Sequence, residues 1–285
     1  MTNIPFGVKS SIERWLTRVA AVGRLCRIHN SLALGLLFLN VNSYYSLLQK
    51  ASYLKASSWV LLSMFAYAYN DLCDIPIDSI NKPGRPIPCG ALSSKSASLI
   101  VQTIGAVAFV LTMMAWRIEF FLPFCAFTGS IFYSRILRPK SSLWSNIVAS
   151  LLVVAVPLSA PAALSNYRVW LLSVSIGLLI FSREMHKDII DLVGDSSFRP
   201  TPVLRGENAG IYVRIYPWLL LASVFFLCLA VREGAFTVMS FTALILTLGS
   251  IFIAVASFIV DSECHKLQAT LTKVASYLIV LILIV

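Results

Sequence analysis

Long apolar segments separated by short polar links dominate this sequence. They recur from residue 28 to the last residue, and most are close to the roughly 20 residues that a helix needs to cross the hydrocarbon core of a bilayer. We expect about nine such helices, at roughly 28–48, 54–73, 96–116, 119–137, 143–164, 167–190, 209–231, 235–256 and 268–285. The pattern predicts an all-α integral membrane protein.

The first 27 residues have a different pattern, in which apolar side chains recur at helical spacing with basic residues between them. The apolar positions are Ile12, Trp15, Leu16, Val19 and Val22, and the basic ones are Lys9, Arg14 and Arg18. This pattern is typical of a helix that lies on an anionic membrane surface, and a solvated basic leader is the alternative. We expect a basic amphipathic leader over 1–27 and a single transmembrane domain over 28–285.

The composition favours a membrane protein over a soluble one. Of the 285 residues, 58% are hydrophobic and 13% are charged, whereas about a quarter of a typical soluble domain is charged. A soluble helical domain would need more charged residues to cover its surface. The six cysteines show no metal-type spacing, so we expect neither a disulfide framework nor a zinc site.

Basic residues gather in the links on one side of the expected helices. Lys and Arg outnumber Asp and Glu by 23 to 13, and the net charge is +10. Since Lys and Arg in short loops favour the cytoplasmic side, we expect the N-terminus and the two acidic stretches described next to be cytoplasmic. The charge needs no nucleic acid to explain it, and it suits an anionic substrate.

Acidic residues are scarce, and six of the 13 are aspartates in two short stretches that end apolar segments. In the first stretch Asn70, Asp74 and Asp78 are four residues apart. In the second, Asp188, Asp191 and Asp195 are three and four apart. Such spacings place side chains on one face of a helix. Pro76 should kink or end the first helix, which would leave Asp78 on a loop.

Partly buried carboxylates repel one another unless a cation lies among them. Oxygen ligands suit Mg²⁺, which usually takes one or two carboxylates and completes its shell with water and substrate phosphate. Two acidic faces therefore suggest two Mg²⁺ ions bridged by a diphosphate, although solvated loop charges are the simpler alternative. Basic side chains suited to phosphate flank both stretches or end the fourth apolar segment: Lys82, Arg85, Arg138, Lys140, Arg183 and Lys187.

These residues carry a resemblance to a known family. Asn70-x-x-x-Asp74-x-x-x-Asp78, followed by Lys82-Pro83-x-Arg85-Pro86, resembles the first signature of the UbiA superfamily of intramembrane prenyltransferases. Asp191-x-x-x-Asp195, preceded by Arg183-Glu184 and Lys187-Asp188, resembles the second. The likeness extends to Arg27, His29-Asn30, Tyr133-Ser134 and Asn146. After Asp195 the chain departs from the family, since Ser196-Ser197-Phe198-Arg199-Pro200 lacks the usual glycine.

The resemblance implies nine helices around a central cavity with cytoplasmic cap loops or helices. It also implies Mg²⁺-dependent transfer of a prenyl group from its diphosphate to an acceptor. Asn70, Asp74 and Asp78 would then hold one ion, and Asp191 and Asp195 the other; together with Arg138 and Lys187 the four aspartates are the predicted catalytic residues. The predicted substrate-binding residues are Asn30, Asp71, Lys82, Arg85, Tyr133, Arg138, Lys140, Arg183, Lys187 and Asp188. Of these, Asp71 and Asp188 would lie just behind the metal ligands.

The outcome of the reaction is left open between several alternatives. The acceptor is an aromatic ring or a glycerol-phosphate lipid, and the second signature looks closest to the branch that prenylates glycerol-phosphate ether lipids. Relatives of this kind also cyclise or hydrolyse the prenyl diphosphate alone. A transporter is less favoured, because the acids cluster at one membrane face. Aromatic side chains that could stabilise a prenyl cation near the signatures are Tyr67, Tyr69, Phe127, Phe132, Tyr133 and Phe181.

Overall fold

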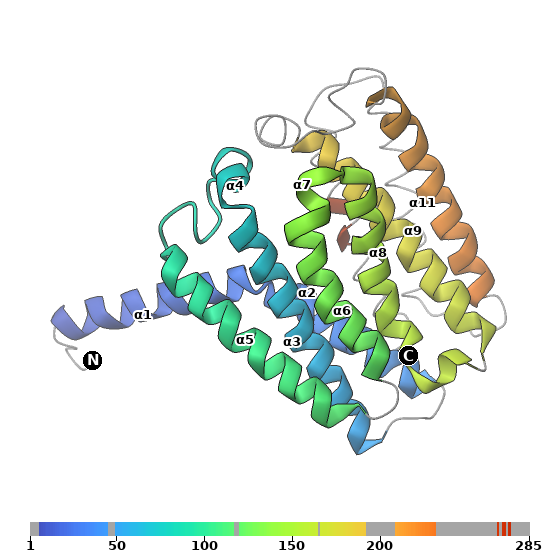
Figure 1. Cartoon of the computed structure of the whole chain (residues 1–285), viewed down its shortest axis with the longest axis horizontal. Helices are drawn as coiled ribbons and strands as arrows, with labels where there is room; N and C mark the ends of the chain where they lie inside the picture. Colours follow the sequence, from blue (N-terminus) through green and yellow to red (C-terminus); the bar gives the residue numbers. More distant parts are fainter. Residues whose placement is uncertain are drawn as a thin grey trace.

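The computed structural model describes residues 6–44, 49–116, 120–164, 166–191 and 209–231, with five further positions between 267 and 274. Within these residues all regular structure is helical. The helices are α1 (Phe6–Leu25), α2 (Ile28–Tyr44), α3 (Lys50–Cys73), α4 (Ile75–Asn81), α5 (Ser94–Ala115), α6 (Phe121–Phe132), η2 (Tyr133–Leu137), α7 (Arg138–Lys140), α8 (Ser142–Leu158), η3 (Pro161–Leu164), α9 (Tyr167–Ile190) and α11 (Ala209–Val231). Figure 1 shows the long helices side by side in one bundle.

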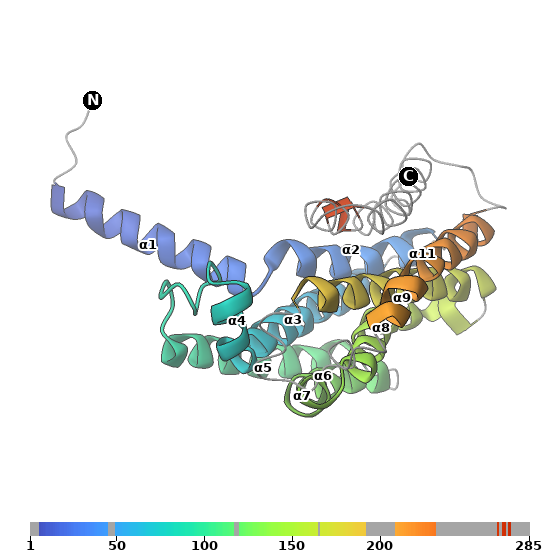
Figure 2. The ribbon, with the colours of Figure 1, turned by 90° about the horizontal axis from the view of Figure 1, so that it is seen from above.

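The bundle has α5 on one flank and α11 on the other (Figure 1). Between them, α3 packs against α2, α5 and α6, while α8 packs against α2, α6 and α9, and α9 packs against α11. Helix α1 extends beyond the bundle, as Figure 2 shows from above. The middle helices α2, α3, α6, α8 and α9 are therefore the ones placed to enclose a cavity.

The first seven predicted spans correspond to described helices. The span expected at 119–137 is formed by α6 and η2 together, and the one at 143–164 is divided into α8 and η3. Pro157 lies at the end of α8 and Pro161 begins η3, and a proline within a helix commonly interrupts it in this way. The spans expected at 235–256 and 268–285 lie outside the described residues, apart from isolated positions of the last one.

Two described helices, α5 and the Tyr167–Asp188 part of α9, are long and apolar enough to cross a membrane, while Ser142–Leu158 and Pro217–Ala230 are apolar but shorter. Helix α5 is the best candidate for contact with lipid, because only 28% of its most apolar 18-residue segment is buried inside the protein. Its outward face carries Leu99, Val107, Val110, Met113 and Met114. An apolar face of this size suits contact with lipid better than contact with water.

The chain bends at the first acidic stretch without losing its helical register. Helix α3 ends at Cys73 and α4 begins at Ile75, which leaves Pro76 in the first turn of α4, where no amide hydrogen is needed. The expectation that Pro76 kinks or ends the first helix is thus confirmed. The expectation that Asp78 could lie on a loop is wrong, since Asp78 is buried within α4 and its N–H donates to the carbonyl of Asp74.

Candidate active site

A large cavity lies between α2, α3, α4, α6, α8 and α9 and encloses about 1220 Å³ of empty space, including its open mouth. Each helix contributes side chains at helical spacing. On α3 they run from Trp59 through Leu62, Ala66 and Tyr67 to Asn70. Polar residues lie at the end near the acidic stretches, and apolar ones lie deeper. Trp59 is about 17 Å along the helix axis from Asn70, given 1.5 Å per residue.

The first acidic stretch presents oxygen atoms to this cavity. Asn70, Asp74 and Asp78 all line it, and both carboxylates are buried. The side-chain nitrogen of Asn70 donates to Oδ2 of Asp74 over 3.0 Å. This leaves Oδ1 of Asn70 buried with no hydrogen-bond partner among the described residues. A buried amide oxygen beside two carboxylates is a donor set that suits a hard cation.

Asp71 does not line the cavity and instead holds two arginines that do. Its Oδ1 accepts from Nη2 of Arg27 over 2.8 Å and from Nη1 of Arg85 over 3.0 Å. The same nitrogen of Arg85 also pairs with Oδ2 of Asp78. Burial raises the pKa of the Asp78 carboxyl, and the charge of Arg85 offsets this only in part.

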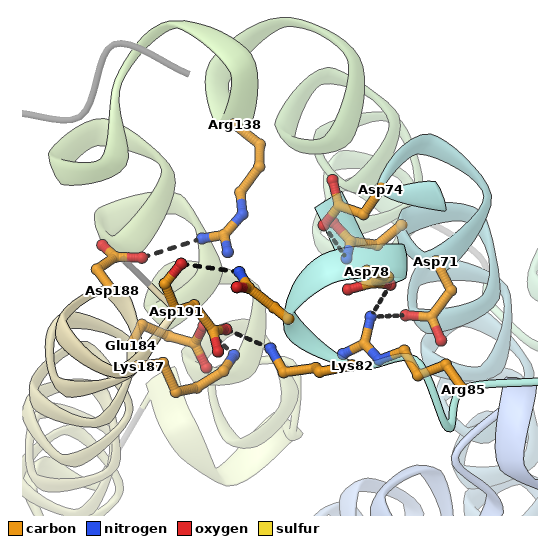
Figure 3. Close-up of polar contacts among 12 residues, drawn as sticks. Asp71, Asp74, Asp78, Lys82, Arg85, Arg138, Glu184, Lys187, Asp188 and Asp191 are labelled. Atoms are coloured by element: carbon orange, nitrogen blue, oxygen red, sulfur yellow. Dashed lines mark hydrogen bonds and ion pairs between the residues drawn. The ribbon is translucent and has the colours of Figure 1, made fainter. Parts of the chain in front are cut away.

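The second acidic stretch divides its carboxylates between two directions, as Figure 3 shows. Asp191 lines the cavity and pairs with Nζ of Lys82, while its backbone carbonyl accepts from the side chain of Asn81 over 2.8 Å. Asp188 is not part of the lining; its carboxylate accepts from Nη1 of Arg138 and from the side-chain nitrogen of Asn146. Of these two aspartates only Asp191 therefore lines the cavity, at the C-terminal end of α9.

Glu184 is a cavity carboxylate to which the sequence assigned no role. It lies on α9, accepts from Nζ of Lys187 over 2.6 Å and lies 3.6 Å from Nη1 of Arg183. All three side chains line the cavity. The spacing of three residues between Glu184 and Lys187 was the available signal for this pair. No comparable signal marked Asn81, whose partner lies 110 residues away.

A π-helical turn brings Tyr133 and Arg138 to the cavity from the other side. Helix η2 inserts between α6 and α7, and π turns of this kind often occur at functional sites. Both residues line the cavity, and Arg138 is buried with its Nη1 3.4 Å from Asp188. Its Nε has no partner among the described residues. Arg138 can therefore still donate to a bound anion.

The structure does not bring every predicted residue to the cavity. Asn30, Lys82, Arg85, Tyr133, Arg138, Arg183 and Lys187 line it, whereas Lys140 is exposed at the end of α7 and is not part of the lining. Asp195 lies outside the described residues. Of the six candidate aromatics only Tyr67 and Tyr133 line the cavity. Tyr69 instead stacks on Phe65, and its hydroxyl accepts from Arg135.

The oxygen donors at the mouth of the cavity suit magnesium. Among the described residues, no group of three His, Cys, Asp or Glu side chains is close enough to hold a metal by itself. Mg²⁺ does not need one, because it commonly takes one or two carboxylates with water and substrate phosphate. The unpartnered Oδ1 of Asn70 beside Asp74 and Asp78 fits this pattern.

Comparisons with known proteins agree on one family. The model of the UbiA prenyltransferase family matches residues 31–277. A digeranylgeranylglyceryl phosphate synthase of Metallosphaera sedula is 26% identical over 277 residues, which cover 84% of this chain and 94% of that protein.

Solved structures share the fold. A structure described as that of digeranylgeranylglyceryl phosphate synthase in membranes superposes with a TM-score of 0.66 at 17% identity, covering 94% of this chain and 97% of the other. A homologue from Archaeoglobus fulgidus bound to GPP and Mg²⁺ superposes with a TM-score of 0.63 at 15% identity, covering 93% and 98%. At these identities the likeness is evidence for the fold alone.

Proposed function

Because the chain belongs to the UbiA prenyltransferase family, we propose that this enzyme transfers a prenyl group from a prenyl diphosphate to the hydroxyl of a glycerol-phosphate ether lipid. The observation that carries the proposal is the cavity itself. Its mouth combines oxygen donors with cations, and its interior is apolar. The glycerol-phosphate acceptor is favoured over an aromatic ring by the Metallosphaera relative, which is a digeranylgeranylglyceryl phosphate synthase.

Magnesium would be held by Asn70, Asp74 and Asp78 on one side and by Asp191 with Asp195 on the other. When bound, Mg²⁺ would act as a Lewis acid that neutralises charge on the departing diphosphate. Two ions are proposed because the two acidic stretches face the same cavity from α3–α4 and α9. The structure of the Archaeoglobus homologue with GPP and Mg²⁺ supports the choice of metal.

The protein's own cations would bind and orient the diphosphate. Lys82 and Arg85 reach the mouth from the segment after α4, Arg138 from α7, and Arg183 and Lys187 from α9. Arginine offers a planar fork to phosphate oxygens, whereas lysine acts as a point charge. Donors placed on three sides of the mouth would stabilise negative charge as it develops on the leaving group.

In the reaction the allylic C–O bond breaks and its electron pair leaves with the diphosphate. The acceptor oxygen then forms the new C–O bond, and its proton is released. The apolar lining formed by Leu62, Leu152, Val153 and Ile180 would hold the prenyl chain and exclude water from the reacting carbon. Exclusion of water favours transfer over simple hydrolysis of the diphosphate.

We further propose that the enzyme is embedded in the membrane with its cavity mouth and N-terminus toward the cytoplasm. The apolar outer face of α5 supports the first part of this proposal. The excess of Lys and Arg in the links at the mouth supports the second. A lipid substrate would then reach the cavity from the bilayer.

The test is Mg²⁺-dependent pyrophosphate release and product formation by the full chain in detergent or vesicles. Asp74→Ala and Asp191→Ala should each lower the rate at least about a hundredfold, because each removes a proposed Mg²⁺ ligand and with the metal the positive charge that would stabilise the departing diphosphate. Lys95→Ala is the matched control, since Lys95 is exposed at the same end of the bundle.

Retained activity in both aspartate variants would contradict the two-ion site. Pyrophosphate release with a cyclised or hydrolysed product and no transfer to the acceptor would instead identify a cyclase or diphosphate hydrolase.

A further inference from the structure

Arg27 has a backbone conformation that residues with a side chain rarely adopt. It connects α1 to α2, and with φ of 45° it is the only non-glycine residue of the described chain with a positive φ. Helices commonly end on a residue of this conformation, but that residue is usually glycine, which has no Cβ to strain. Strain of this kind is a pointer to function when the side chain has a specific task.

The side chain of Arg27 lines the cavity and is held by two contacts. Its Nη2 donates to Asp71 over 2.8 Å, and its guanidinium lies over the ring of Tyr67, 4.8 Å from the ring centroid. Both contacts leave most of its five N–H donors available to a ligand. Burial by itself lowers the pKa of Arg27, but the charge of Asp71 raises it, and the net pKa lies above the ordinary value.

Arg27 is set apart from the cations that serve the diphosphate. Lys82, Arg85, Arg183 and Lys187 belong to the segments of the two acidic stretches, whereas Arg27 comes from the start of α2. Arg27 and Arg85 nevertheless share Oδ1 of Asp71. A second anion bound at Arg27 would therefore lie beside the diphosphate, where an acceptor has to be.

The side chains along α2 form a graded surface. Arg27 lines the cavity from the residue just before α2, and it is followed by Asn30 and Leu34, which are four residues apart on one face of α2. Their order is a cation, an amide and an apolar side chain. A glycerol-phosphate lipid has the same order, with a phosphate, a polar glyceryl unit and an alkyl chain.

From this juxtaposition we infer that Arg27 binds the phosphate of the acceptor lipid, with the glyceryl unit at Asn30 and the alkyl chain at Leu34. The inference rests on the proposed function. It makes Arg27 the residue that selects a phosphorylated acceptor over a neutral one. The strained backbone is retained because glycine at this position would supply no guanidinium.

The experiment compares two acceptors in the full-length enzyme: a prenylglyceryl phosphate and the same lipid after removal of its phosphate. In Arg27→Gly the KM for the phosphorylated acceptor should rise about tenfold to a hundredfold, as expected for loss of a charged hydrogen bond. The preference for the phosphorylated acceptor should fall toward one, and the KM for the prenyl diphosphate should stay unchanged. Arg27→Lys, which keeps the charge but not the fork, should retain part of the preference.

Arg24→Ala is the matched control, because Arg24 is exposed in the last turn of α1 and should not alter acceptor preference. A rise in the KM for the prenyl diphosphate instead of the acceptor would overturn the inference and assign Arg27 to the diphosphate. An unchanged preference in both Arg27 variants would overturn it as well. If the unmodified enzyme prenylates neither acceptor, the proposed function itself fails, and the inference fails with it.

Discussion

Asp71 shows how a single residue organises the mouth of the cavity. It is buried behind the lining, and one of its oxygen atoms accepts from both Arg27 and Arg85. A carboxylate used in this way fixes two planar guanidinium groups relative to each other. Asp188 serves Arg138 in a similar way on the opposite side. Aspartates that do not face the cavity thus set the direction of the cations that do.

Next to Arg27, Cys26 gives a test of packing at the scale of one residue. It is fully buried, and burial together with the nearby charge of Asp71 raises the pKa of its thiol to about 11. At pH 8 only about one molecule in a thousand would carry the reactive thiolate. In variants that keep one cysteine each, maleimide should therefore label Cys89, which is exposed, far faster than Cys26.

The labelling rate of Cys26 should rise as the pH is increased toward 11, since its thiolate forms only near that pKa. Rates measured by mass spectrometry between pH 7 and pH 10 check this. Equal labelling of the two cysteines at pH 8 would show that the junction between α1 and α2 is open.

At the scale of elements, close packing between helices positions the two acidic stretches. Helix α3 carries the first stretch, and Phe65 on its opposite side stacks between Tyr69 and Phe127. Gly105 of α5 lies directly against this ring, and a Cβ at Gly105 would come within 2.8 Å of it. The absence of a side chain at Gly105 is what lets α5 approach α3.

Gly105→Ala should therefore destabilise the protein by about 1–3 kcal/mol through overpacking. The matched control is Gly84→Ala, because no atom lies within 4 Å of a Cβ built at Gly84, and it should change stability by less than about 0.5 kcal/mol. The apparent melting temperature in detergent measures both. A melting temperature as high for the Gly105 variant as for the control would mean that α3 and α5 can separate without cost.

At the scale of the whole molecule, the end of the cavity opposite its charged mouth is lined by tryptophan. Trp59 lines that end, and its indole N–H donates to Ser159 over 3.0 Å. Trp116 packs edge-on against Trp59 and donates to Ser58 over 2.8 Å. We expect these two hydrogen-bonded tryptophans to act as the floor of the cavity and so to limit the length of the prenyl chain that the enzyme can bind.

Trp59→Phe should deepen the cavity and raise the rate with a longer prenyl diphosphate, relative to a shorter one, several-fold. Trp116→Phe is the matched control, because Trp116 is buried in the same cluster but does not line the cavity. Product analysis with donors of increasing length measures the ratio. A similar shift in both variants would mean that loosening of the core, rather than the floor at Trp59, sets the preference.

Most of the helical architecture followed from local patterns. Apolar segments of membrane-spanning length predicted the first seven helices, and Pro76 predicted the break between α3 and α4. The secondary structure at Asp78 was predicted wrongly, because a proline in the first turn of a new helix does not force the chain into a loop. The common position of Asn70, Asp74 and Asp78 at the cavity was predictable, because their spacing lies within a few helical turns.

The sequence by itself thus determined the described helices and the family, since these depend on residues a few positions apart. Only the tertiary structure decided which side chains meet. Arg27 reaches Asp71 across 44 residues, Lys82 reaches Asp191 across 109, and Arg138 reaches Asp188 across 50. Such pairings depend on which helices pack together and on how each is rotated about its axis. Local spacing gives the residues of one face, and packing alone decides what that face contacts.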